Sequence, residues 1–243
     1  CVTAYEASIA ARVDEAGVDL VLVGDSLGMV VQGHASTLPV TMDAMVYHTA
    51  CVARGLRRAF LVADLPFMAF RDVPTAFANA TRLVAEGGAA MVKLEGADWV
   101  CEIISALTSR EIPVCAHLGL TPQSIYKFGT YSVRAKEETE AAQLEKDALL
   151  LQEAGCFALV LEKIPASLAK TVSERLSIPT IGIGAGHHCD GQVLVMHDML
   201  GINNEFNPRF LRKYAHLHEN ITTAVQQYIS DVRSQNFPND QEQ

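Results

Sequence analysis

The stretch Val21-Leu22-Val23-Gly24-Asp25-Ser26 sets the pattern from which the fold of this chain can be inferred. Its apolar residues and glycine have no polar face, which is typical of a β-strand that is buried on both sides. A carboxylate directly after such a strand lies at the edge of a hydrophobic core, where charge is costly unless a partner neutralises it. A single case would indicate only a turn into solvent, with Asp25 capping the loop that follows.

The pattern recurs along the chain, with helical segments between the apolar runs. Alternating strands and helices predict parallel strands, and about eight such units in a chain of 243 residues predict a (β/α)8 barrel of the TIM type. The predicted strands cover residues 1–5, 18–26, 59–64, 91–95, 113–117, 157–162, 179–184 and 192–196. The predicted helices cover residues 6–16, 41–55, 75–86, 99–110, 141–154 and 167–176, and the remainder after 196 is expected to be helical.

We expect a single domain over residues 1–243, with a C-terminal helix and polar tail from about residue 219. Because the chain begins at Cys1, without methionine, and enters a strand at once, we expect its native N-terminus to be missing. The segment 123–139 is too long for a passive connection and is expected to form a lid or binding loop.

Composition excludes several classes of partner. The net charge of −9 and the pI near 5.3 argue against nucleic acid, and no apolar run is long enough to span a membrane. The six cysteines form no C-x-x-C pair, which favours free thiols in a reducing compartment. We therefore expect a cytoplasmic protein, with a mitochondrial location open because any targeting peptide would precede Cys1.

Polar residues gather at the C-terminal ends of the predicted strands. In a parallel barrel these ends meet at one rim, where active sites are built. Four carboxylates at such a rim repel one another unless a cation neutralises them, and Mg2+ prefers carboxylate oxygens. Zinc is disfavoured because only one of these residues, a histidine, is a typical zinc ligand. The residues are Asp25, Ser26, Asp64, Lys93, Glu95, His117 and Glu162.

Each residue also has an ordinary structural explanation. Asp64 precedes Leu-Pro and is compatible with a turn, and Lys93 with Glu95 is compatible with a structural ion pair. His117 is compatible with a hydrogen-bonded core histidine, and Glu162 with a salt bridge to a neighbouring lysine. Together these explanations require unrelated causes at one rim, which favours a shared site.

Seven blocks of the sequence resemble the ketopantoate hydroxymethyltransferase family, in order and over nearly the whole chain. They are Val23-Gly24-Asp25-Ser26, Ala63-Asp64-Leu65-Pro66-Phe67, Val92-Lys93-Leu94-Glu95-Gly96, the run from His117 to Gln123, Leu161-Glu162, the run from Ile181 to Gly186 and the run from Asp190 to Asp198. The segment from Gly129 to Ala135 departs from the family's usual pattern.

The resemblance implies a Mg2+-dependent barrel enzyme, related to isocitrate lyase and phosphoenolpyruvate mutase. It would transfer a hydroxymethyl group from 5,10-methylenetetrahydrofolate to 3-methyl-2-oxobutanoate through an enolate, giving 2-dehydropantoate for pantothenate synthesis. It also implies a homo-oligomer, often a decamer. By the family's pattern Asp25, Asp64 and Glu95 bind the metal, and Asp25, Ser26, Asp64 and Lys93 hold the 2-oxo acid. Glu162 transfers the proton, and His117 is expected only in the wall of the site.

Two other functions stay open at this point. The first is a Mg2+-dependent lyase or mutase of the isocitrate lyase type, which also forms enolates of 2-oxo acids in a barrel. The second is a non-catalytic paralogue that serves as an assembly subunit. The retained Asp25, Asp64, Lys93 and Glu162 argue against the second function, whereas the altered segment 129–135 leaves room for it.

Overall fold

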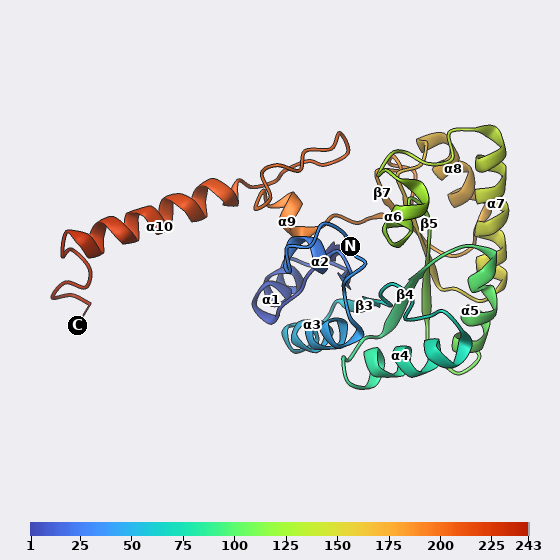
Figure 1. Ribbon diagram of the computed structural model, residues 1–243, viewed down its shortest axis with the longest axis horizontal. Coiled ribbons are helices and arrows are strands. Elements are labelled where there is room, and N and C mark those ends of the chain that lie inside the picture. Colours follow the sequence, from blue (N-terminus) through green and yellow to red (C-terminus); the bar gives the residue numbers. More distant parts are fainter. Residues whose placement is uncertain (243) are drawn as a thin grey trace. The chain divides into compact units, whose positions relative to one another are not determined.

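Eight parallel β-strands form the centre of the structure, a computed structural model that describes residues 1–242 (Figure 1). Their order in the sheet is their order in the chain. A bridge between Val2 and Leu194, with a 3.2 Å hydrogen bond from the Thr3 amide to the Leu194 carbonyl, closes the sheet. The predicted (β/α)8 barrel is therefore confirmed. The strands are β1 Val2–Thr3, β2 Leu20–Val23, β3 Phe60–Asp64, β4 Met91–Glu95, β5 Val114–Gly119, β6 Ala158–Glu162, β7 Thr180–Ile183 and β8 Gly191–Gln192.

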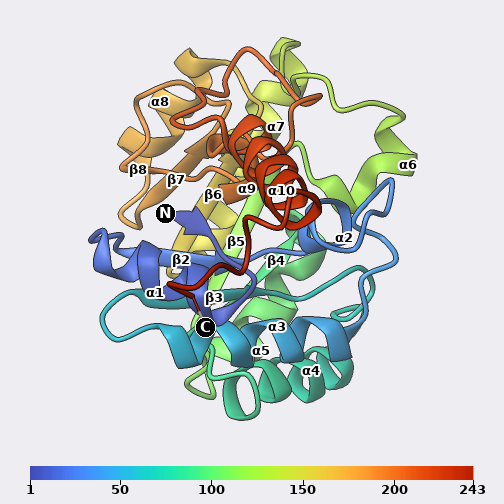
Figure 2. The same cartoon turned by 90° about the vertical axis from the view of Figure 1, so that its left-hand side faces the viewer.

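Helices between the strands cover the outside of the sheet (Figure 2). Three of them begin at a side chain that accepts hydrogen bonds from free amides, as helix starts require, and these side chains belong to Glu6, Thr41 and Asp72. The Ala44 amide donates to Thr41 Oγ1 over 3.2 Å, and the Thr75 amide donates to Asp72 over 2.8 Å. The helices are α1 Ala7–Glu15, α2 Leu27–Val30, α3 Met42–Gly55, α4 Val73–Ala85, α5 Cys101–Thr108, α6 Ile125–Phe128, α7 Glu138–Glu153 and α8 Ala166–Arg175, with 3-10 turns η1 Asp98–Val100 and η2 Pro122–Ser124.

The strands separate two apolar layers. Leu22, Val62 and Met91 belong to the layer inside the barrel, whereas Val21 and Leu61 pack in the layer between strands and helices. Successive side chains of a strand point to opposite faces, so every second residue faces the barrel interior. The position of a strand's last residue in this alternation therefore decides whether its side chain enters the barrel.

From Met196 onward the chain forms a second compact unit, separate from residues 1–195. It contains α9 Met196–Met199 and α10 Leu217–Arg233, and no regular secondary structure lies between them. The expectation that this whole region is helical is therefore wrong for residues 200–216. This segment contains Asn203-Asn204 and Asn207-Pro208, which favour turns over helix. One domain over residues 1–243 stays a prediction.

The last strand is shorter than predicted. Regular pairing in β8 ends at Gln192, and Leu194 contributes only the isolated bridge to Val2, before α9 begins at Met196. The apolar run continues through this change, and an apolar run by itself does not mark where a strand ends. Among the described residues, no helix is long and apolar enough to cross a membrane.

Gly119 offers a test of how tightly β5 and β6 approach each other. Its φ is +92°, and a Cβ there would lie 2.2 Å from the Glu162 carbonyl oxygen, whereas Gly17, with φ +90°, has open space around it. We expect Gly17→Ala to cost about 1–2 kcal/mol for the left-handed backbone alone. Gly119→Ala should cost about 1–3 kcal/mol more, because the strands must move apart.

Urea unfolding of the two variants and the unaltered chain, followed by circular dichroism, measures both costs. Equal losses of stability in Gly17→Ala and Gly119→Ala would contradict the close approach of the two strands.

Candidate active site

Alternation along the strands directs charged side chains into the barrel. Lys93 lies two residues after the inward-facing Met91, and it lines one small internal cavity together with Met91 and Cys115. Glu95 follows two residues later, and Asp64 holds the equivalent position after Val62. The pairing of Asp64 with Lys93 and of Glu95 with His117 in adjacent strands then places these side chains side by side.

The first group joins β2, β3 and β4. The Lys93 ammonium donates to Asp64 Oδ1 over 2.5 Å, and the side chains of both residues are about 5% exposed or less. The backbone amide of Asp25 donates to Asp64 Oδ2 over 3.0 Å. Asp64 is therefore held at both oxygens, and it links Asp25 to Lys93.

Gly24 permits this approach. A Cβ at Gly24 would lie 2.8 Å from Ser26 Oγ and 3.4 Å from Asp64 Oδ2. A larger residue would therefore disturb Ser26 and tighten the space beside Asp64. Ser26 Oγ lies 2.8 Å from the hydroxyl of Tyr5, which is buried beside β1, so the serine is held from a neighbouring strand end.

The second group joins β4, β5 and β6. His117 Nδ1 lies 3.4 Å from Glu95 Oε1, and His117 Nε2 lies 3.5 Å from Glu162 Oε2. Among residues 1–242, neither ring nitrogen has a closer hydrogen-bond partner. The Glu162 side chain is 16% exposed, against 3% for His117, so the group reaches solvent only at Glu162. The imidazole thus separates two carboxylates at the inner wall of the barrel.

The sequence did not identify the side chains of Gln123 and Tyr5 as part of this site. Gln123 is buried in the turn η2, and its side-chain amide donates to Asp25 Oδ2 over 2.8 Å. Its backbone amide donates to Glu95 Oε2 over 3.0 Å. Gln123 ends one of the sequence blocks that resemble the family, whereas Tyr5 lies in none of them, and nothing in a neutral amide or a phenol signals contact with a charged cluster.

The electrostatics of the site follow from burial and crowding. Burial, with the nearby carboxylates of Asp64 and Glu95, raises the pKa of Asp25 well above its usual value. Burial alone would lower the pKa of Lys93, but Asp64, Glu95 and Asp25 outweigh it and raise the pKa. The ammonium is therefore charged at neutral pH, whereas the ionised form of Asp25 is disfavoured.

In the second group the pKa of the histidine is raised and the pKa of a carboxylate is lowered. Burial would lower the pKa of His117, but the contacts with Glu162 and Glu95 outweigh it and raise the pKa to about 9. Burial would raise the pKa of Glu95, but the hydrogen bonding and charge of His117, with further help from Lys93, lower it. At neutral pH His117 is therefore a cation between carboxylates.

The charges of the two groups do not balance. Four carboxylates (Asp25, Asp64, Glu95 and Glu162) face two cationic side chains (Lys93 and His117), which leaves a surplus of two negative charges when all are ionised. One divalent cation would carry the compensating charge. The site residues thus fit a metal ion by charge and by donor type, since hard divalent cations prefer carboxylate oxygens.

The number of direct ligands is small. Within residues 1–242, no three side chains of His, Cys, Asp or Glu are grouped closely enough to hold one metal ion together. Asp25 and Asp64 are linked by a single hydrogen bond from backbone to side chain, whereas Glu95 is occupied by Gln123 and His117. Two carboxylates suffice for Mg2+, which commonly takes one or two from the protein and fills its other positions with water and substrate.

Residues 123–139, which the sequence predicts to form a lid or binding loop, are tied to the residue that follows Glu162. The Lys163 ammonium donates to the Tyr131 carbonyl over 2.8 Å, and the Arg134 amide donates to the Lys163 carbonyl over 2.8 Å. Arg134 also pairs with Glu140 at the start of α7. Burial raises the pKa of the Tyr131 hydroxyl, and the negative charges of Glu162 and Asp25 add to it. The segment therefore lies beside the site.

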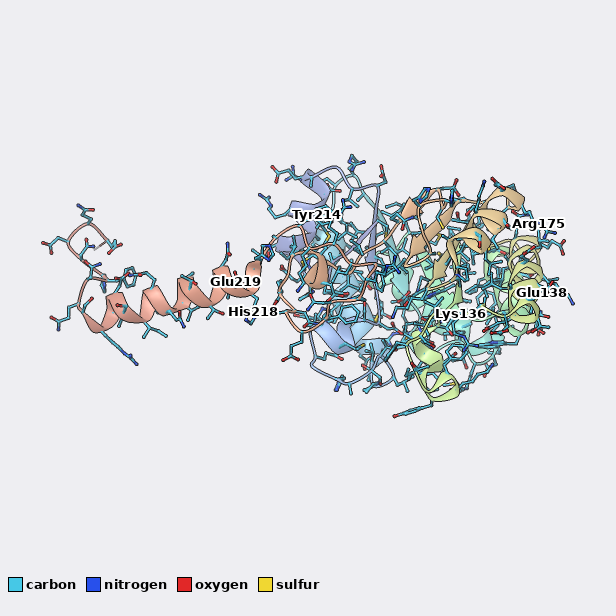
Figure 3. The ribbon with its side chains drawn as sticks, turned by 90° about the horizontal axis from the view of Figure 1, so that it is seen from above. Lys136, Glu138, Arg175, Tyr214, His218 and Glu219 are labelled. Atoms are coloured by element: carbon cyan, nitrogen blue, oxygen red, sulfur yellow. The ribbon has the colours of Figure 1, made fainter. Side chains whose placement is uncertain are left out.

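A shallow groove along α7 and α8 has a different character. It is lined by Glu138, Glu145, Lys146 and Arg175, and Arg175 pairs with Glu145 over 2.5 Å. Figure 3 shows Glu138 and Arg175 at the outer margin of the barrel unit. Its charged groups are solvated or paired, so the groove lacks the uncompensated charge that marks the site inside the barrel.

Comparison with known proteins gives a consistent result for sequence and fold. A sequence model described as ketopantoate hydroxymethyltransferase matches residues 1–240. The chain is 57% identical to the 3-methyl-2-oxobutanoate hydroxymethyltransferase of Flavobacterium johnsoniae and 58% identical to that of Cytophaga hutchinsonii, and in each case the match covers 99% of this chain and 89% of the relative.

The fold is similar to that of 2,3-dimethylmalate lyase, a member of the PEP mutase/isocitrate lyase superfamily. The TM-score is 0.61 at 14% identity, and the match covers 98% of this chain and 83% of the lyase chain. At that identity the likeness concerns the fold alone. The family model matches residues 1–240, and the identity with the two relatives extends over 89% of their length. The chain therefore belongs to the ketopantoate hydroxymethyltransferase family.

Proposed function

We propose that this chain transfers a hydroxymethyl group from 5,10-methylenetetrahydrofolate to 3-methyl-2-oxobutanoate, giving 2-dehydropantoate for pantothenate synthesis. The observation that carries the proposal is the convergence of four carboxylates and two cationic side chains at the C-terminal ends of the barrel strands. The names of the relatives identify the 2-oxo acid as the acceptor. The folate donor comes from the family resemblance.

In this proposal Asp25 and Asp64 hold Mg2+, and Glu95 adds negative charge beside it. When bound, the metal supplies positive charge that stabilises negative charge developing on the keto oxygen of the substrate. Lys93 neutralises the substrate carboxylate, since its ammonium is charged and only about 5% of its side chain is exposed. Ser26, held by Tyr5, contributes a hydroxyl to the same 2-oxo acid.

Glu162 is the proposed base. It is the most exposed carboxylate of the cluster, at 16% of its side chain, so a substrate can reach it. It removes the proton from the carbon next to the keto group, and the resulting enolate attacks the one-carbon unit of the donor. His117, 3.5 Å from Glu162, holds the carboxylate in place and is part of the site wall.

The assembly and the cellular location are also proposals. All six cysteines are free, which suits the reducing environment of the cytoplasm. The family resemblance supports a homo-oligomer, with a decamer as the expected size.

The base assignment predicts a selective loss of proton transfer. In Glu162→Gln the amide keeps the shape of the side chain but cannot accept the proton, so turnover should fall by about 10²–10⁴-fold. NMR of 3-methyl-2-oxobutanoate in D2O with Mg2+, without folate, measures the exchange of the C3 proton directly, and this exchange should be lost to the same extent.

Binding of the 2-oxo acid to Glu162→Gln should change little. The matched control is Glu174→Gln, which removes a carboxylate from the exposed Lys170–Glu174 pair of α8. Normal exchange in Glu162→Gln would exclude Glu162 as the base. If the unaltered chain converts the 2-oxo acid without methylenetetrahydrofolate, the result would favour a lyase or mutase. If the unaltered chain shows neither exchange nor turnover, the result would favour a non-catalytic paralogue.

The metal assignment predicts an effect on cation binding. Asp25→Asn removes a charged ligand oxygen, and we expect Mg2+ affinity, measured by isothermal titration calorimetry on the metal-free chain, to fall at least about tenfold. Asp147→Asn is the control, because Asp147 is also buried but lies on α7 with Gln143 as its partner. Unchanged affinity in Asp25→Asn would rule out Asp25 as a ligand.

His117 predicts a pH dependence of stability in the metal-free chain. Its pKa is raised to about 9 in the folded state, so protonation stabilises the fold. This contribution is complete below the unfolded pKa of about 6.5 and is lost as the pH rises through about 9, a difference on the order of 3 kcal/mol. The free energy of unfolding, measured by urea titration from pH 6 to 10, should fall over this window. His117→Asn should remove that slope, and an unchanged slope would refute a protonated His117.

A further inference from the structure

Gln123 is a buried neutral residue at the centre of the charged cluster. It lies in the turn η2, directly after β5, and only 8% of the residue is exposed. The proposed reaction uses no group that an amide could supply as acid or base. Its three hydrogen bonds nevertheless reach the ends of three other strands.

Gln123 is the donor in all three of these hydrogen bonds. Its Nε2 donates to Asp25 Oδ2 over 2.8 Å and to the Leu65 carbonyl over 3.0 Å, and its backbone amide donates to Glu95 Oε2 over 3.0 Å. A primary amide has two N–H donors, so both are used. One residue from the β5 loop thus fixes groups that follow or end β2, β3 and β4.

The chemistry of the side chain suits this position. A glutamate would direct acceptor oxygens at the Asp25 carboxylate and at the Leu65 carbonyl, so both contacts would become repulsive. A lysine would donate as well, but it would add a positive charge that competes with a bound cation. A neutral amide can orient a carboxylate without reducing the negative charge of the cluster.

We infer that Gln123 is a positioning residue, which holds one oxygen of Asp25 and one of Glu95 so that the carboxylate cluster is ordered for a divalent cation and the 2-oxo acid. The inference rests on the proposed function, because it assumes that Asp25 takes part in cation binding. It extends that function to a residue that touches neither the reacting atoms nor, in the proposal, the metal.

A purely structural role makes a different prediction. If Gln123 only anchored the η2 turn, its replacement would lower stability and leave cation affinity unchanged. If it orders the carboxylates, cation affinity falls even where the fold is intact. Groups that hydrogen-bond to metal ligands typically change metal affinity by about 10–100-fold when they are removed.

The test is Gln123→Met in the full chain, since methionine keeps the length and removes both side-chain donors. Isothermal titration calorimetry with Mg2+ and paramagnetic resonance with Mn2+ should each give an affinity about 10–100-fold below that of the unaltered chain. The KM for 3-methyl-2-oxobutanoate should rise at fixed Mg2+, and saturating Mg2+ should restore part of the loss. Thermal unfolding of the metal-free chain serves as the measure of stability.

The matched control is Gln143→Met. Gln143 Nε2 donates to Asp147 Oδ1 over 2.8 Å on α7, so this variant loses an equivalent bond from amide to carboxylate in another part of the structure. Its cation affinity should be unchanged. Gln123→Asn is the second variant, because it keeps a polar amide if methionine prevents folding. Its side chain is one methylene too short to reach Asp25, and it should lose cation affinity as well.

Three outcomes separate the inference from the function on which it rests. Lower cation affinity in Gln123→Met or Gln123→Asn, with Gln143→Met unchanged, supports the positioning role. Unchanged affinity in a folded Gln123 variant overturns it and leaves the proposed function intact. Absence of Mg2+ and Mn2+ binding in the unaltered chain overturns the cation proposal itself, and the inference with it.

Discussion

The site depends on the burial of more negative than positive charge inside a barrel. Lys93 and His117 each lie between carboxylates, and their raised pKa values express how strongly those carboxylates favour a cation nearby. The pKa of Asp25 is also raised, but for a carboxylate this means that the charged form is disfavoured. Burial and the neighbouring carboxylates of Asp64 and Glu95 are the causes. Burying an uncompensated charge in a protein interior costs several kcal/mol, so such an arrangement persists where a ligand or function compensates for it.

The barrel makes this arrangement possible because its strands enclose an interior. In β4 the alternation of side chains places Lys93 and Glu95 in the interior, whereas Val92 and Leu94 pack towards the helices. A flat sheet with a solvated face would expose the same residues to water. The apolar inner layer below them, from residues such as Met91 and Val160, keeps water away from the stem of Lys93. The lower part of the barrel is therefore a packed core, and the upper part is the site.

Most site residues are held by a group from a different strand or loop. Ser26 is held by Tyr5, Asp64 by the amide of Asp25, and Asp25 by Gln123. The segment 129–135 is fastened through both the ammonium and the carbonyl of Lys163, so the loop and the proposed base share one support. Each strand end is thereby held by its neighbours. This is the property expected of a preorganised site, in which orientation is fixed before the substrate binds.

The sequence by itself determined the parallel barrel, because apolar runs of strand length alternate with helical segments and each pattern has its own period. It also determined the polar residues at the strand ends, because charge beside a buried run is conspicuous. It is less informative where no periodic burial acts, as in residues 200–216, where turn-forming asparagines and a proline lie in a region predicted to be helical.

Only the tertiary structure decided which face Lys93 and Glu95 occupy, because residues two apart share a face and the sequence leaves open which face it is. Only the structure brought Gln123 to Asp25, which lies 98 residues away in the chain. A neutral amide carries no charge and follows no pattern that would indicate its partner in the sequence. Its role comes from the closure of the sheet, which brings distant loops to one rim.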